Sequence, residues 1–155
     1  FPDFTYSLQT NVTWKNIDLS IFFQGVQGIE GYQSFPPFSN FSNTPIWFKD
    51  RWTPNHTNTS IPRLVKDDNR NLINSEAYVE NASYLRLKNI EIGYTLPKGW
   101  LNKIGISNLR VYGNIQNAFT ITNFRGWDPE RPVGETGMTA YPQTRIYTFG
   151  VNLEF

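Results

Sequence analysis

Apolar and polar residues alternate with a period of two at the start of the chain. Even positions from 4 to 14 are mostly apolar or aromatic, whereas odd positions from 3 to 13 are polar and almost all uncharged. Such alternation places apolar side chains on one face of a β-strand and polar side chains on the other. After Lys15-Asn16 the apolar residues move to odd positions, which indicates a turn. The pattern predicts a hairpin with strands at about 3–14 and 16–25.

Three later segments alternate in the same way and predict strands at about 82–96, 108–120 and 143–155. The segments between the strands, about 26–81 and 121–142, show no sustained period and are rich in Asn, Thr, Pro and Gly. A structureless segment as long as the first would be unusual inside a compact soluble domain. Outer-membrane β-barrels, in contrast, combine long extracellular loops with short periplasmic turns.

The length of the predicted strands also favours a membrane protein. They have about 10–13 residues, more than the ~5–6 that are usual in soluble sheets and enough for the ~9–11 of a tilted transmembrane strand. The sequence therefore predicts an all-β protein, in which five antiparallel strands of a transmembrane β-barrel turn apolar faces to lipid and polar faces to a hydrated lumen. The alternative is a soluble β-sandwich that buries its aromatic residues and acts as a carbohydrate-binding module.

The strand at 82–96 changes parity, because Leu85 and Leu87 are at odd positions while Ile90 and the following apolar residues are at even ones. A β-bulge near Lys88-Asn89 would account for this change. Alternatively, the upper half of the strand stands above the membrane and packs Leu85 and Leu87 inward. We favour the second explanation.

Composition restricts the possible chemistry. A net charge of +1 from 14 basic and 13 acidic residues argues against a nucleic-acid partner, which needs a basic surface. Without cysteine and with a single histidine, thiolate sites are excluded and multi-histidine metal sites have little support. Asp18 and Glu91 are far apart in the sequence and do not suggest a glycosidase pair. We expect no enzymatic activity, no metal and no cofactor.

Five strands cannot form a closed barrel, because the smallest such barrels have about eight. Open sheet edges in lipid would leave backbone groups without hydrogen bonds, at several kcal/mol each. We therefore expect the chain to be the C-terminal part of a longer polypeptide.

Several motifs resemble SusC/RagA-type TonB-dependent transporters, and they occur in the order of that family along almost the whole chain. They are Pro2-Asp3-Phe4, Trp14-Lys15-Asn16-Ile17-Asp18-Leu19, Arg51-Trp52-Thr53-Pro54, Ser83-Tyr84-Leu85-Arg86-Leu87-Lys88-Asn89, Gly93-Tyr94-Thr95-Leu96-Pro97, Leu109-Arg110-Val111-Tyr112, Gln116-Asn117-Ala118-Phe119, Trp127-Asp128-Pro129-Glu130 and Tyr141-Pro142-Gln143-Thr144-Arg145.

This resemblance implies a 22-stranded barrel with an N-terminal plug in the outer membrane of Bacteroidota, of which the chain would form the last five strands. It also implies a SusD-like surface lipoprotein as a lid and uptake of oligosaccharides, or sometimes peptides. Energy would come from TonB, through an N-terminal part that is absent here.

Candidate contact residues for substrate or lid lie in the two predicted extracellular loops, where aromatic rings could stack on sugars and charged groups could bind hydroxyls. They are Trp47, Arg51, Trp52, Trp127, Asp128 and Arg131. The alternatives are internal packing of Trp47, Phe48 and their neighbours, and an exposed Asp128–Arg131 pair worth at most ~1 kcal/mol. We interpret Asp67-Asp68-Asn69 as a solvated tip rather than a Ca²⁺ site, and His56 as solvated.

The last strand carries apolar or aromatic residues at every second position: Tyr147, Phe149, Val151, Leu153 and Phe155. This looks like the C-terminal signal that the barrel-assembly machinery reads. These side chains would also face outer-membrane lipid, and both roles are compatible.

Overall fold

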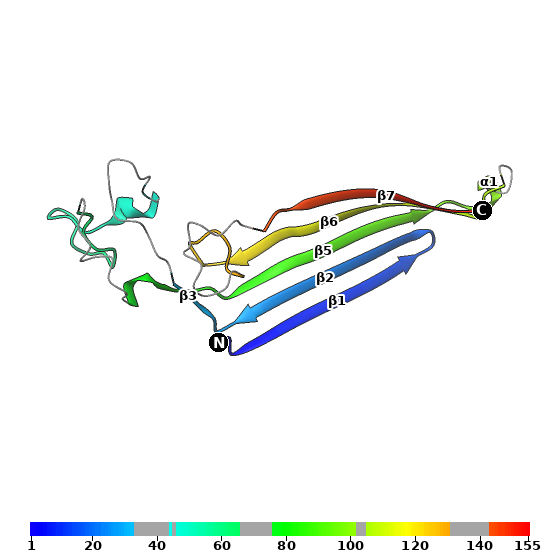
Figure 1. The fold of residues 1–155 in the computed structure, drawn as a ribbon. Coiled ribbons are helices and arrows are strands. Elements are labelled where there is room, and N and C mark those ends of the chain that lie inside the picture. Colours follow the sequence, from blue (N-terminus) through cyan, green and yellow to red (C-terminus); the bar gives the residue numbers. More distant parts are fainter. Residues whose placement is uncertain (33–43, 45, 66–75, 102–104, 131–142) are drawn as a thin grey trace.

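The computed structural model describes residues 1–32, 44, 46–65, 76–101, 105–130 and 143–155. Its main feature is one antiparallel sheet of five long strands in the order β1-β2-β5-β6-β7, which lie side by side in Figure 1. Their bounds are Phe4–Trp14, Ile17–Gln27, Tyr84–Thr95, Asn108–Thr122 and Ile146–Glu154. The five antiparallel strands predicted from the alternation are therefore confirmed.

Smaller elements lie at the two ends of this sheet (Figure 1). At one end, which we call the loop end, β3 (Glu30–Tyr32) pairs with β4 (Val79–Asn81), and the 3₁₀ helices η1 (Ile46–Asp50) and η3 (Glu76–Tyr78) lie nearby. At the other end, the turn end, are the β1–β2 turn and the short helix α1 (Lys98–Leu101).

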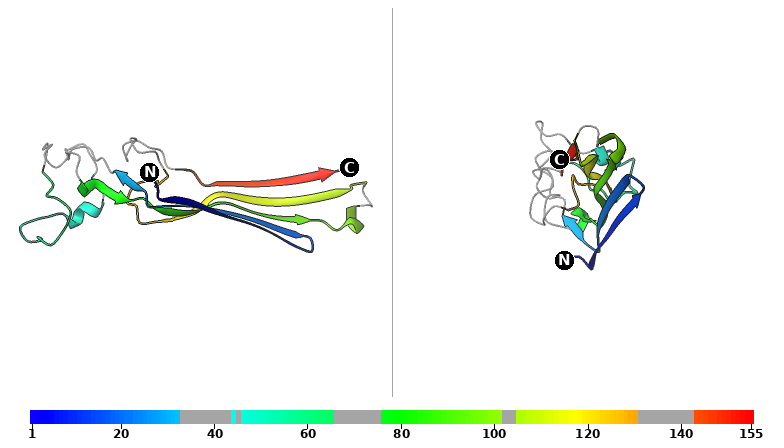
Figure 2. Two further views of the ribbon diagram at one scale, coloured as in Figure 1. Left: turned by 90° about the horizontal axis from the view of Figure 1, so that it is seen from below. Right: turned by 90° about the vertical axis from the view of Figure 1, so that its right-hand side faces the viewer.

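The sheet is a single curved layer, as the two views in Figure 2 show. No second sheet packs against the long strands in the part of the chain that the structure describes. The β-sandwich alternative is therefore wrong, because a sandwich needs two facing sheets to bury its aromatic side chains. Among the described residues, no helix is both long enough and apolar enough to cross a membrane.

The β1–β2 hairpin has the tight connection that the change of parity predicts. Trp14 pairs with Ile17, so that only Lys15 and Asn16 form the turn. Lys15 has a φ of 54°, in the left-handed region that two-residue hairpin turns require. The register places Leu8 opposite Phe23, and the apolar residues of both strands therefore share one face.

A β-bulge at Lys88 explains the change of parity in β5. Leu87 pairs with Phe23, but the next paired residue of β5 is Asn89, opposite Phe22. Because Lys88 is skipped, Leu85 and Leu87 lie on the same face as Ile90. Our preferred explanation, in which the two leucines pack inward, is wrong.

Strand β6 has a matching irregularity, since Leu87 pairs with Phe119 and Asn89 pairs with Gln116. Asn117, between these paired residues, has a positive φ of 51°. Two residues of β6, Asn117 and Ala118, lie opposite Lys88, and the apolar residues of β6 stay at odd positions on both sides of them, so that the apolar face continues along the full length of the sheet.

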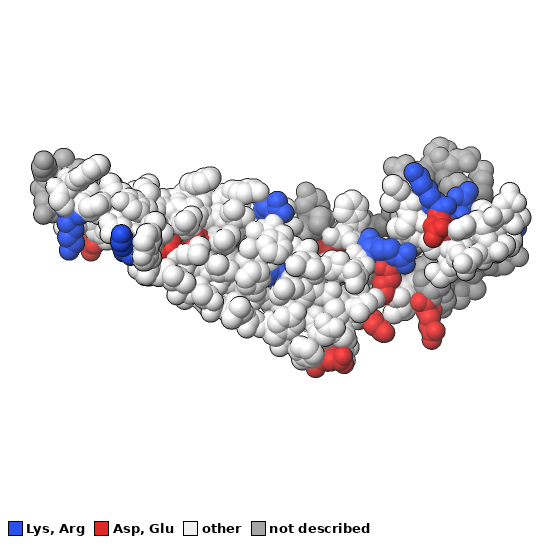
Figure 3. All heavy atoms as spheres, turned by 180° about the vertical axis from the view of Figure 1, so that it is seen from behind, with Lys and Arg blue, Asp and Glu red and all other residues white. Residues whose placement is uncertain are grey.

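This apolar face is exposed rather than packed on a core. Leu8 is 61% exposed, Ile92 57% and Val151 62%. Figure 3 shows few charged side chains along the strands and more of them near the two ends of the molecule. Most buried side chains gather at the loop end: Val26, Phe48, Ile61, Tyr78, Ala82, Tyr84 and Leu87.

Candidate functional site

The polar face of the sheet carries an ion cluster near the turn end. Arg110 of β6 donates hydrogen bonds to Asp18 of β2 and, over 2.8 Å, to Glu91 of β5. The two carboxylates that are distant in the sequence thus meet at one guanidinium group, and the arrangement is an ion cluster rather than an acid–base pair. In the sequence, the only indication of this ion cluster is that all three residues lie on the polar face of their strands.

Two glycines let long side chains lie flat on this polar face. A Cβ atom at Gly150 would be 2.3 Å from the ring of Tyr112, and one at Gly93 would be 2.4 Å from the guanidinium group of Arg110. The guanidinium carbon of Arg110 lies 5.0 Å from the centre of the Tyr112 ring, within cation–π range. Replacing Gly150 by any other residue would displace the Tyr112 ring, and replacing Gly93 would displace the guanidinium group of Arg110.

A second ion cluster is buried at the loop end. Arg86 of β5 is only 3% exposed. Its guanidinium group donates to Asp128, Glu130 and Thr120, over 2.7 Å in each case. Lys88, which the bulge places next to this cluster, donates to Glu130 over 2.5 Å. The cluster therefore fixes the segment that follows β6 against β5.

Asp128 uses both carboxylate oxygens within the chain. Oδ1 accepts hydrogen bonds from Arg86 and from the backbone N–H of Glu130, and Oδ2 accepts one from the backbone N–H of Gln143. Burial by itself raises the pKa of Asp128, but these hydrogen bonds outweigh it and hold the pKa below its ordinary value. We considered Asp128 as a ligand contact, and the structure places it instead among structural partners. Arg131, its other sequence-based partner, lies outside the described residues.

Trp127, next to Asp128, is 66% exposed. Asp128 and Glu130 are held by Arg86, so this exposed ring sits on an immobilised segment. Because the segment is already ordered, a ligand or protein that binds the Trp127 ring would cause little loss of conformational entropy.

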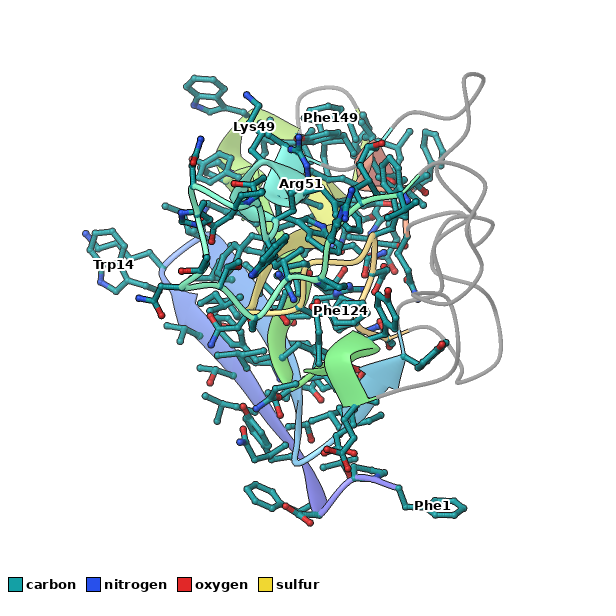
Figure 4. The ribbon with its side chains drawn as sticks, turned by 90° about the vertical axis from the view of Figure 1, so that its left-hand side faces the viewer. Phe1, Trp14, Lys49, Arg51, Phe124 and Phe149 are labelled. Atoms are coloured by element: carbon teal, nitrogen blue, oxygen red, sulfur yellow. The ribbon has the colours of Figure 1, made fainter. Side chains whose placement is uncertain are left out.

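The aromatic cluster around η1 is packed within the loop end. The rings of Trp47 and Phe48 stack with their centres 4.1 Å apart, and the guanidinium group of Arg125 lies 4.6 Å from the Trp47 ring. Arg125 also pairs with Glu80 of β4 over 2.5 Å. Arg125 therefore ties together segments that belong to two different predicted loops; Figure 4 looks onto this end of the molecule and labels Arg51 and Phe124.

Three further described residues of the first loop, Arg51, Trp52 and His56, have local partners. Arg51 donates to the carbonyl oxygen of Phe48 over 3.3 Å, and the backbone N–H of Trp52 donates to the carbonyl oxygen of Ile61 over 2.9 Å. His56, which we expected to be solvated, is partly exposed but lies 2.8 Å from a carboxylate oxygen of Asp50. Residues 67–69 lie outside the described residues.

The residues of the proposed assembly signal lie on or directly after the edge strand β7. Phe149 is 86% exposed and Val151 62%, and the register places Val151 beside Val111 on the apolar face of the sheet. Phe155 follows the strand and is 84% exposed. The described residues contain no group of three or more side chains that could hold a metal ion.

The sequence is similar to TonB-dependent receptors along its whole length. It is 35% identical to TonB-dependent receptor P3 and 31% identical to TonB-dependent receptor P26, both of Formosa agariphila; each alignment covers 99% of this chain, and 16% and 17% of the relative respectively. It is 38% identical to TonB-dependent receptor SusC of Bacteroides thetaiotaomicron over 52% of this chain and 8% of that protein. No protein-family model matches the sequence.

Solved structures of the RagAB peptide importer have a similar fold. The 'open-open' and 'closed-closed' states match with TM-scores of 0.78 and 0.75, at 27% identity, over 100% of this chain and 17% of the matched chain. The chain thus spans only 16–17% of the length of these relatives. The long sheet corresponds to a fragment of their β-barrel, and the chain belongs to the SusC/RagA family of TonB-dependent receptors.

Proposed function

We propose that this chain forms part of the barrel wall of an outer-membrane importer that depends on TonB. The observation that carries the proposal is the single-layer sheet with one apolar, exposed face and one polar face. Hydrocarbon would cover the face with Leu8 and Val151, and the lumen would be lined by the face with Arg110 and Tyr112. The loop end would lie outside the cell and the turn end in the periplasm, because the long connections are at the loop end.

The rest of the barrel would pair with the two edges of this sheet. In the described residues β1 and β7 each have a neighbouring strand on one side only. An open edge is costly in lipid because its backbone N–H and C=O groups have no partner. We therefore propose that the remainder of a longer protein continues the barrel on both sides, and that β7 also carries the signal for the barrel-assembly machinery.

The proposed substrates are oligosaccharides or peptides, taken up together with a SusD-like lipoprotein. Support comes from the similarity to SusC and to structures described as a peptide importer. In this chain, Trp127 is the best-placed contact for substrate or lipoprotein, because it is exposed on a segment that Arg86 immobilises. Arg51 and Trp52 would contribute from the first loop, and Arg131 from the second.

Deletion of the gene for the full-length receptor tests this function. The strain should lose growth on the oligosaccharide or peptide mixture that the wild-type strain imports, and plasmid-borne receptor should restore growth. A photo-crosslinking amino acid in place of Trp127 should capture a surface lipoprotein, whereas the same group in place of Val151, on the lipid face, should not. Unchanged growth on all oligosaccharides and peptides that the wild type uses would contradict the proposal.

A further inference from the structure

Phe22 of β2 is an aromatic residue on the otherwise polar face of the sheet. The register pairs Phe22 with Gln9 of β1 and with Asn89 of β5, so that the three side chains share one face. Asn89 pairs in turn with Gln116 of β6. A partly exposed ring thus lies in a row with three carboxamide side chains, which we call the Phe22 row. Neither ion cluster of the polar face includes this ring.

The groups around the ring have free hydrogen-bonding capacity. Ser20 and Gln24 lie two residues before and after the ring, on the same face of β2. In the described part of the chain, the side chains of Gln9, Ser20 and Gln24 make no hydrogen bond. Hydroxyl and carboxamide groups both donate and accept hydrogen bonds. The surroundings of the ring therefore suit a ligand that carries many donors and acceptors of the same kind.

The charged side chains nearest the Phe22 row are already paired within the chain. Lys88 donates to Glu130 over 2.5 Å, and Glu91 accepts a hydrogen bond from Arg110 over 2.8 Å. Arg86 is buried in the ion cluster at the loop end. A ligand at the ring would therefore meet uncharged groups, and a charged ligand would lose water without gaining a free partner of opposite charge.

The Phe22 row lies directly beside the irregularities of β5 and β6. Lys88 is skipped between Leu87 and Asn89, and Asn117 follows Gln116. Bulges are frequent next to active sites, because they change the direction in which a side chain points. The regular pairing of the sheet is thus interrupted at the same level at which an aromatic ring interrupts the polar face.

We propose that the Phe22 row binds a neutral oligosaccharide. The C–H face of a pyranose ring would pack on the Phe22 ring, and the sugar hydroxyls would bond to the carboxamides of Gln9 and Asn89. Asn89 accepts a hydrogen bond from Asn114 at Oδ1, which leaves its amino group available. This inference rests on the proposed function, because it requires the polar face to line a lumen. It selects oligosaccharides over peptides, whose charged termini and side chains would have no free counter-charge at this surface.

Arrays of immobilised oligosaccharides and peptides test this site with the purified full-length receptor. The oligosaccharides include neutral, uronic-acid and sulfated members, and the wild type should bind neutral ones in preference to all other ligands. Phe22→Leu, which stays apolar but loses the aromatic ring, should weaken binding of the best neutral oligosaccharide about tenfold in isothermal titration. Phe22→Tyr should retain the affinity, and Gln9→Met should weaken binding about fivefold.

Phe23→Leu is the matched control, because it makes the same exchange one residue along β2. Phe23 is on the apolar face, where its ring centre lies 6.3 Å from that of Phe119, and this variant should bind like the wild type. Equal affinities of Phe22→Leu and Phe23→Leu, with both barrels folded, would overturn the inference. Should Phe22→Leu fail to fold, wild-type affinity in Gln9→Met would overturn it.

The array itself gives two further decisive outcomes. Absence of binding to every neutral oligosaccharide, or binding of peptides or anionic oligosaccharides alone, would overturn the inference. A receptor that binds a neutral oligosaccharide through Phe22, but does not restore growth of the deletion strain on it, would support this site and contradict the proposed import. Failure of the site and failure of the proposed function are therefore distinguishable.

Discussion

Replacement of Arg86 by methionine should lower the free energy of unfolding of the receptor by about 3–5 kcal/mol. Arg86 is buried and donates to Asp128, Glu130 and Thr120. Methionine has a similar volume, but it would leave the buried carboxylate of Asp128 without its cation, and an unpaired buried charge is far more costly than a lost pair. The change is measured as the shift in urea-induced unfolding of the purified full-length protein.

Two matched variants separate this effect from a general loss of packing. Arg125→Met removes a guanidinium group that is 43% exposed, so its pair with Glu80 should contribute only ~1 kcal/mol or less. Combining Arg86→Met with Asp128→Asn removes the stranded charge, while Glu130 keeps its pair with Lys88, and should recover much of the stability. If Arg86→Met is no more harmful than Arg125→Met, the buried cluster does not hold the segment after β6.

Replacement of Phe149 by arginine should cost about 2–4 kcal/mol of barrel stability if the residue lies near the middle of the membrane. Phe149 is on the exposed apolar face of β7, opposite Gly113. A guanidinium group there would have to enter hydrocarbon. The fraction of receptor that reaches the folded, heat-modifiable form in the outer membrane measures the effect.

Thr148→Arg is the matched control, because Thr148 is the neighbouring residue and pairs with Asn114 on the polar face. An arginine on that face would extend into the hydrated lumen, so we expect the folded fraction to stay close to that of the wild type. Equal loss of folded receptor in both variants would show that the assigned facing of β7 is incorrect.

The five strands could be predicted because the period of two is a local signal. The polarity of each residue indicates which face of its strand the side chain is on. The change of parity after Lys15-Asn16 indicates the hairpin without information from the rest of the chain. The bulge at Lys88 could not be assigned in this way. The sequence shows the same parity change for a bulge and for a strand that turns inward, and only pairing with Phe23 and Phe119 decides between them.

The ion clusters were missed for a related reason. Arg86 and Asp128 are 42 residues apart, and Arg110 and Asp18 are 92 apart. Their contact depends on the order and register of three strands, which single-residue patterns do not contain. Asp128 in particular follows a strand and precedes a proline, which is typical of an exposed loop, and its burial becomes evident only when the loop is placed over β5.

The central claim is that lipid covers one face of this sheet and water the other. Nitroxide spin labels at Leu8 and Gln9, adjacent residues of β1, test it most directly in the full-length receptor reconstituted in lipid vesicles. The label at Leu8 should be accessible to oxygen, which concentrates in the hydrocarbon, and the label at Gln9 to a water-soluble nickel complex. The same accessibility at both positions would contradict the account.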